Sequence, residues 1–214
     1  MTRSANVTHR LFPMFMRLEG LEVLVVGAGK VAERKVASLL STGAMVKVVA
    51  PDIGEPIADL ADKGDVAVIE RCFAPEDLDG VALAFCATDD PTVSERVSRE
   101  AMARSVPVNV VDVPDLCSFF VPSVLTRGAL QIAVSTSGAA PSVARDIRLS
   151  LEDGFEAWWE DCMDELALMR TLAKRALPDA PSAERSSLME AAAGSLSPRT
   201  RQDRRYLRTM PCAS

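Results

Sequence analysis

The chain has 214 residues, of which 48% are hydrophobic. This length and composition suffice for one sizeable core, or for a core with a smaller satellite domain, and argue against disorder throughout. Lys and Arg number 24 and Asp and Glu number 30, so the formal net charge is 24 − 30 = −6. A negative protein attracts a nucleic-acid backbone weakly, so the charge argues against nucleic-acid binding and favours a small-molecule partner.

The cysteine and histidine content argues against disulfides and a permanent metal centre. The five cysteines form no C-x-x-C pair, which favours a reduced, cytoplasmic setting. They are Cys72, Cys86, Cys117, Cys162 and Cys212. The one histidine, His9, lies in a polar leader, so no local Cys/His cluster can form a structural zinc site. We therefore expect no bound metal.

The first 20 residues are basic and partly apolar, but they do not resemble a signal peptide. Arg10, Pro13 and Arg17 interrupt the apolar stretch, and no small-residue cleavage site follows one. No apolar run in the chain approaches the roughly 20 residues that a membrane-spanning helix needs. We expect a soluble protein without membrane contact.

From Leu21 to Asp112, short runs rich in β-branched residues alternate with amphipathic segments. Runs such as "VLVV" are apolar on successive residues, as in strands that are buried on both faces of a parallel sheet. The pattern predicts the α/β fold class, with a Rossmann-like doubly wound sheet in a domain at 1–114 that includes a leader at 1–13. Strands are expected at 21–27, 45–50, 66–70, 81–88 and 106–112, and helices at 31–40, 53–63 and 91–104.

After Pro114 the pattern changes to two closely spaced strands, at 118–125 and 129–136, with a turn at 126–128. A helix then begins near Pro141, with Val143, Ile147 and Leu151 on one apolar face. These elements predict a small α/β domain at 115–153.

Residues 154–214 show no strand pattern and predict a helical domain. Helices are expected at 155–177, 182–193 and 198–210. The last is rich in arginine, which indicates either a solvated helix face or a surface for an acidic ligand. These arginines are Arg199, Arg201, Arg204, Arg205 and Arg208.

The run "GAGKVA" at 27–32 matches G-x-G-x-x-A, directly after an apolar strand and directly before a helix. Gly27 permits a tight turn, Gly29 lets a pyrophosphate approach the backbone, and Ala32 lets helix and strand pack closely. The first helical residues, Lys30 and Val31, supply free N–H donors for the phosphates. The alternative is a strand-to-helix turn whose small residues serve packing alone.

The end of the second strand bears on which dinucleotide binds. Asp52 lies two residues beyond the run, and either Asp52 or the backbone near Pro51 is expected to contact the adenosine ribose. No arginine follows at once to hold a 2′-phosphate, so the sequence favours NAD over NADP.

At this point the chain resembles a known family, the precorrin-2 dehydrogenases, which include the N-terminal module of siroheme synthase. Five motifs in the family's order carry the resemblance over most of residues 14–153. They are "GAGKVAERK" (27–35), "VVAPD" (48–52), "ATDDPTVSERV" (87–97), "NVVDVPDLCSFFVPS" (109–123) and "AVSTSGAAPSVARDIR" (133–148). Two departures are Ser94, where the family often has asparagine, and Ser137 in a loop that is frequently richer in glycine.

The resemblance implies that NAD+ takes a hydride from precorrin-2, and that proton loss leaves sirohydrochlorin, a precursor of siroheme and some cobalamin. It also implies a homodimer that exchanges central strands and helices. Some members also insert Fe2+ into sirohydrochlorin and others only dehydrogenate; the sequence leaves both open. Members with a C-terminal methyltransferase domain are longer, and the 214 residues leave no room for one.

The resemblance also suggests roles for individual residues. Asp112 ends the fifth strand, at the edge where doubly wound sheets bind ligands, and matches the aspartate implicated in catalysis, a general base. The alternative is that Asp112 only caps a turn before Pro114. Thr88 is a candidate cofactor contact, whereas Asp89 and Asp90 follow it as candidate helix caps.

Candidate substrate-binding residues come from two motifs. Hydroxyls and free amides between the last strand and its helix are suitable partners for the acidic side chains of precorrin-2, or else they only cap that helix. Arg145 and Arg148 lie off the apolar stripe, where they pair with substrate carboxylates or with solvent. The set chosen is Asn109, Ser135, Thr136, Ser137, Gly138 and Arg145.

A hypothesis of another class also remains, a nucleotide-sensing regulatory module. Such a module needs Gly27 and Gly29 but not Asp112.

Overall fold

The computed structural model describes residues 10–178 and 181–195, and they form two compact units that meet between Val121 and Pro122. The expected third helix at 198–210, with its five arginines, lies outside the described residues. The boundaries expected at 114 and 153 stay predictions about folding domains.

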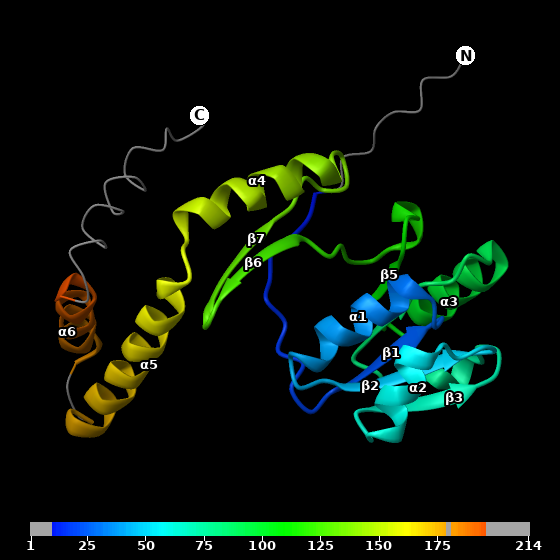
Figure 1. Ribbon diagram of the computed structural model, residues 1–214, viewed down its shortest axis with the longest axis horizontal. Helices are drawn as coiled ribbons and strands as arrows, with labels where there is room; N and C mark the ends of the chain where they lie inside the picture. The colour runs from blue at the N-terminus through cyan, green and yellow to red at the C-terminus, as the bar shows by residue number, and fades with distance from the viewer. Residues whose placement is uncertain (1–9, 179–180, 196–214) are drawn as a thin grey trace, which may run out of the picture. The chain divides into compact units, whose positions relative to one another are not determined.

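The first unit contains a five-stranded parallel sheet in the order β3-β2-β1-β4-β5 (Figure 1). This order confirms the Rossmann-like fold class expected from the sequence. Its strands are β1 (Glu22–Val26), β2 (Met45–Ala50), β3 (Val66–Glu70), β4 (Leu83–Cys86) and β5 (Val108–Val110). Its helices are α1 (Lys30–Leu40), α2 (Glu55–Asp62), α3 (Pro91–Ala103) and the short 3-10 turns η1 (Pro75–Leu78) and η2 (Pro114–Leu116).

Successive residues of β1 enter two different cores, because side chains alternate across a strand. Val23 and Val25 pack with α1 and α2, whereas Leu24 and Val26 pack with η1 and α3. All four are at most 4% exposed. The unbroken "VLVV" run is therefore explained by helices on both faces of the sheet.

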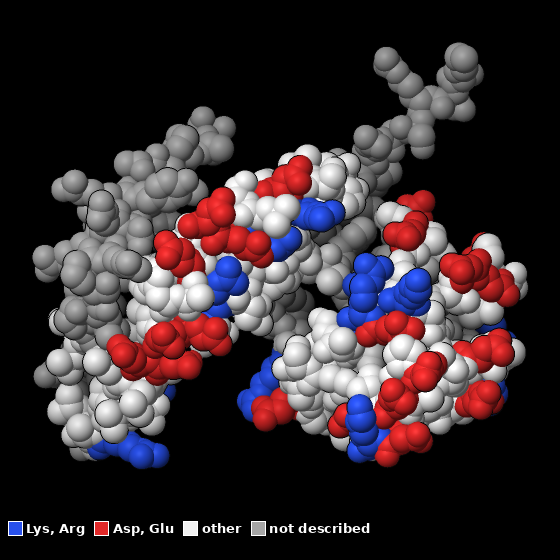
Figure 2. All heavy atoms as spheres, in the orientation of Figure 1, with Lys and Arg blue, Asp and Glu red and all other residues white. Residues whose placement is uncertain are grey.

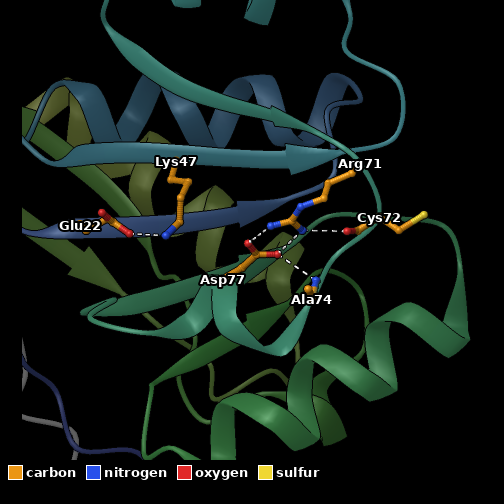
Figure 3. Close-up of polar contacts among 6 residues, drawn as sticks. All are labelled: Glu22, Lys47, Arg71, Cys72, Ala74 and Asp77. Carbon is orange, nitrogen blue, oxygen red and sulfur yellow. Dashed lines mark hydrogen bonds and ion pairs between the residues drawn. The ribbon is translucent and has the colours of Figure 1, made fainter.

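On the α3 side, Asp77 of η1 is a buried carboxylate with three hydrogen-bond donors (Figure 3). Arg71 binds both of its oxygens, through Nη2 at 2.6 Å and Nη1 at 2.9 Å, and the amide of Ala74 donates at 2.8 Å. The same figure shows Lys47 of β2 paired with Glu22 of β1. These pairs fix the crossover between β3 and β4.

The second unit begins with an antiparallel hairpin of β6 (Ser123–Arg127) and β7 (Leu130–Val134). The turn expected at 126–128 is wrong by two residues, since Arg127 pairs with Leu130 and the turn is Gly128-Ala129. Gly128 has φ +54°, which suits a tight hairpin turn. Three helices follow, α4 (Pro141–Gly154), α5 (Trp158–Ala176) and α6 (Ser182–Ser195).

Helix α4 carries the apolar stripe expected from its sequence, but this stripe is not buried within the chain. Val143 is 48% exposed and Ile147 is 44% exposed, whereas the buried residue of α4 is Ala144. Amphipathic periodicity identified the helix correctly, yet it did not show which surface covers the apolar face.

Candidate active site

The glycine turn joins the end of β1 to the beginning of α1. Gly27 has φ +106°, a conformation that glycine adopts without strain, and its amide donates to the carbonyl of Val49 at 2.9 Å. Gly29 is the N-cap of α1, and no side chain caps this helix. A Cβ added to Gly29 would meet no atom within 4 Å. The turn therefore leaves open space in front of the helix N-terminus, where a pyrophosphate can approach.

The first turn of α1 places the other residues of the motif in distinct environments. Lys30 is exposed and Val31 is partly buried, whereas Ala32 is fully buried against the sheet. The small side chain of Ala32 lets the helix lie close to the strands, as the motif requires. These residues fit a dinucleotide phosphate group.

A second turn lies beside the glycine turn. Pro51 and Asp52 are exposed directly after β2, and Gly54 caps α2. A Cβ on Gly54 would lie 3.5 Å from the carbonyl oxygen of Ala28. This proximity gives the Asp52 segment access to the region where the adenosine half of a dinucleotide lies in this fold.

Backbone hydrogen bonds connect the glycine turn to Asp112 along the carboxyl edge of the sheet. The amide of Ala87 donates to Val26 at 2.8 Å, and the amide of Val111 donates to Cys86 at 2.9 Å. Asp112 follows directly, exposed and in the left-handed region at φ +61°. The structure thus brings the cofactor turn and the candidate base to the same edge of one unit.

The residues after β4 divide between capping and packing. Asp90 caps α3, because its Oδ1 accepts from the amides of Thr92 at 2.8 Å and Val93 at 3.4 Å. Thr88 Oγ1 in turn accepts from the amide of Asp90 at 3.3 Å. Ser94 is buried, with its Oγ 3.8 Å from the sulfur of Cys86, so its side chain packs in the core.

Helix α1 also presents positive charge, which sequence inspection did not single out. Figure 2 shows Lys and Arg side chains gathered over α1, which carries Lys30, Arg34 and Lys35. The Lys35 Nζ lies 5.5 Å from the centroid of the Phe85 ring. Partial burial lowers the pKa of Lys35, and the nearby Arg34 lowers it further. Helix periodicity alone could have placed Lys35 beside the sheet, one residue before the buried Val36.

Asn109, expected to bind substrate, is held within the first unit. Its Nδ2 donates to the carbonyl of Phe119 at 3.0 Å and approaches the sulfur of Cys117 at 3.6 Å. Phe119 stacks edge-on against Phe85, with ring centroids 5.4 Å apart. Asn109 therefore anchors the segment after the Asp112 turn.

The remaining candidates belong to the second unit. Thr136 Oγ1 accepts from the amide of Ala140 at 3.1 Å, and Ser135 Oγ accepts from the amide of Ser137 at 3.1 Å. Gly138 and Arg145 are exposed, whereas Arg148 pairs with Glu152. The hydroxyls of this loop order its own backbone ahead of α4.

Two searches of the described residues returned nothing. Within 10–178 and 181–195, no group of three or more His, Cys, Asp or Glu side chains is placed to hold a metal ion. Across the same ranges, no helix is both long enough and apolar enough to cross a membrane.

The fold and its edge define a dinucleotide-binding Rossmann protein. The family described as "Putative NAD(P)-binding" matches residues 14–123, and the one described as "Sirohaem biosynthesis protein central" matches residues 127–153. The chain therefore belongs to the family of precorrin-2 dehydrogenases and siroheme synthase N-terminal modules, which confirms the resemblance inferred from its motifs.

Individual relatives agree with this assignment. A siroheme synthase from Methylobacillus flagellatus is 46% identical over 140 residues, which are 65% of this chain and 30% of that protein. One from Azotobacter vinelandii is 42% identical over 167 residues, 78% of this chain and 36% of that protein. The chain thus spans about a third of the length of these curated relatives.

A solved structure covers nearly the whole fold. The structure titled "SirC, precorrin-2 dehydrogenase" superposes with a TM-score of 0.73 at 25% sequence identity, over 92% of this chain and 98% of that chain. The similarity extends beyond the Rossmann unit into the hairpin and the helices that follow it.

Proposed function

We propose that this chain is a precorrin-2 dehydrogenase, an NAD+-dependent oxidoreductase that forms sirohydrochlorin for siroheme synthesis. The observation that carries the proposal is the backbone path from the glycine turn, through Ala87 and Val111, to Asp112. This path places a hydride acceptor and a carboxylate at the same edge of one sheet. The relatives' names supply the substrate.

The reaction removes two hydrogens from the substrate as a hydride and a proton. NAD+, when bound, supplies the hydride acceptor. Asp112 takes the proton as a general base, while its exposed position at the end of β5 gives substrate access to the carboxylate. The amides at the beginning of α1 hold the pyrophosphate, and the Asp52 turn contacts the adenosine ribose, which favours NAD over NADP.

The cofactor-binding set in this proposal is Gly27, Gly29, Lys30, Val31, Ala32, Pro51, Asp52 and Thr88. Substrate carboxylates bind Arg145 and the hydroxyls and amides of the loop before α4. That substrate-binding set is Asn109, Ser135, Thr136, Ser137, Gly138 and Arg145. The four described cysteines are free and the cofactor is NAD, which together support a cytoplasmic location.

We also propose that the active form is a homodimer that exchanges elements of the second unit. The support is apolar surface that this chain leaves uncovered: Val143 and Ile147 on α4 are 48% and 44% exposed, and Val124 on β6 is 41% exposed. A second copy that packs on these side chains removes them from water. Ile147→Asp is expected to convert the dimer to monomer in light scattering, whereas Arg145→Asp should leave the mass unchanged.

The test of function uses purified chain, NAD+ and precorrin-2 under anaerobic conditions. We expect NADH and the sirohydrochlorin spectrum to appear together. Asp112→Ala should abolish turnover while NAD+ binding persists; Asp115→Ala, an exposed carboxylate three residues further on, should turn over like the wild type. Wild-type protein that yields neither product overturns the proposal, and a nucleotide sensor would bind NAD+ without turnover. Adding Fe2+ to the same reaction tests chelation separately.

A further inference from the structure

The loop that carries Asp112 is closed at its base by a thiol. Asp112 lies between Val110, the last residue of β5, and Cys117, just after η2. The amide of Val110 donates to Cys117 Sγ at 3.1 Å, and that sulfur lies 3.1 Å from the Val110 carbonyl as a donor. The same thiol is 3.4 Å from the carbonyl of Val113. One side chain therefore contacts the backbone on both sides of Asp112.

The segment after the loop is held against β5 by side chains in place of a regular strand ladder. Ser118 Oγ accepts from the amide of Val108 at 2.8 Å, and the amide of Ser118 donates to the Val108 carbonyl at 2.8 Å. Ser98 Oγ of α3 donates to the carbonyl of Leu116 at 2.8 Å. These contacts fix the far side of the loop, and the thiol joins that side to β5 at the point nearest Asp112.

The state of the thiol suits this role. Burial raises the pKa of Cys117, although the hydrogen bond from Val110 opposes the rise, so the sulfur stays protonated at neutral pH and keeps a hydrogen to donate. Its lone pairs accept from Val110 and from Asn109 Nδ2. A thiol supplies both functions in a volume close to that of a methyl-bearing side chain.

Asp112 needs such support because its backbone is in the left-handed region, at φ +61°. This conformation is uncommon for a residue with a Cβ and persists where the surroundings over-determine it. We infer that Cys117 is a positioning residue for the reaction: its thiol holds the Val110–Val113 turn in the conformation that directs the Asp112 carboxylate. The inference rests on the proposed function, in which Asp112 is the base.

The experiment compares three substitutions at Cys117 in the full chain, with precorrin-2 and NAD+ as substrates. Cys117→Val keeps a similar volume but removes the hydrogen bonds, Cys117→Ser keeps them, and Cys117→Ala removes both. We expect Cys117→Val and Cys117→Ala to lower kcat by on the order of 10- to 100-fold, as misplaced catalytic groups do. The KM for NAD+ should not change, because the glycine turn is on another strand. Cys117→Ser should recover most of the loss.

Cys72→Ala is the matched control, since Cys72 is exposed and its sulfur has no part in this loop. Wild-type kcat in Cys117→Val overturns the inference, and so does a Cys117→Ser enzyme as slow as Cys117→Val. A parallel fall in kcat and NAD+ affinity would show a structural role alone and also overturn it. If Cys117→Ala does not fold, the Val and Ser pair decides. Normal turnover of Asp112→Ala would instead remove the proposed base, a result distinct from failure at Cys117.

Discussion

Gly27 and Ala87 approach each other so closely that no side chain fits between them. A Cβ on Gly27 would lie 2.2 Å from the carbonyl oxygen of Ala87, and 3.4 Å from the amide nitrogen of Thr88. The obstacle is backbone at the end of β4, which cannot rotate away as a side chain would. This contact keeps the glycine turn against the strand that leads to Asp112.

Gly27→Ala is therefore expected to lower the free energy of unfolding by about 3 kcal/mol, through overlap and a strained positive φ. The measurement is urea unfolding followed by circular dichroism. A variant as stable as the wild type would contradict the contact. Gly64→Ala, at φ +79° with no atom within 4 Å of the added Cβ, isolates the cost of φ alone.

Gly29→Ala should separate stability from binding. Gly29 has an ordinary φ of −79°, and an added Cβ meets no protein atom within 4 Å, so stability should change by less than about 0.5 kcal/mol. The same methyl occupies the space through which a pyrophosphate approaches the backbone, so NAD+ affinity should fall by about tenfold or more, roughly 1.4 kcal/mol. Calorimetric titration with NAD+ measures this loss. Unchanged affinity would argue against the glycine turn as the phosphate site.

The sheet was predictable from sequence because its strands must be buried on both faces, and the uninterrupted "VLVV" run of β1 records that burial. The glycine motif was predictable for a similar local reason, since it lies between one strand and one helix. In both cases the residues that matter are adjacent in the chain.

Other features depend on contacts that have no local signal. Cys117 carries no periodic mark, and its hydrogen bonds to Val110 and Val113 exist only once the loop is folded. The hairpin turn was misplaced because Gly128 suits several positions of a tight turn, whereas the pairing of Arg127 with Leu130 fixes the register. The stripe on α4 was recognised, but its exposure depends on what covers it.

Ser137 offers a test in the loop before α4. Its φ is +54°, and no Cβ-bearing residue adopts this conformation without strain. Ser137→Gly should therefore raise the free energy of unfolding by about 1 kcal/mol, measured by urea unfolding. Ser142→Gly, on an exposed position inside α4, should instead destabilise by about 1 kcal/mol. The two glycines are thus expected to act in opposite directions, and equal losses would contradict the assigned backbone of Ser137.

Asp77 should make the stability of the first unit depend on pH. Burial alone would raise its pKa, but the hydrogen bonds from Arg71 and Ala74 and the charges of Arg71 and Lys47 outweigh burial, so the pKa lies below the usual 3.8. A carboxylate with a lowered folded-state pKa stabilises the fold above its unfolded pKa, and that stabilisation is lost as the pH falls through the folded value. The pH-dependent contribution is therefore complete at neutral pH and decreases below about pH 4.

Asp77→Asn removes the charge but keeps an acceptor for Ala74, so it is expected to lower stability by about 1–2 kcal/mol at pH 7. The difference from wild type should shrink steadily as urea unfolding is repeated from pH 5 towards pH 2, because protonation then removes the charge from the wild-type side chain as well. Asp79→Asn is the control: this carboxylate is 72% exposed and lies 3.7 Å from Arg104, so its loss should change stability by less than about 0.5 kcal/mol. A difference for Asp77→Asn that stays constant down to pH 2 would mean that packing around the side chain, and not its ion pair with Arg71, stabilises the crossover.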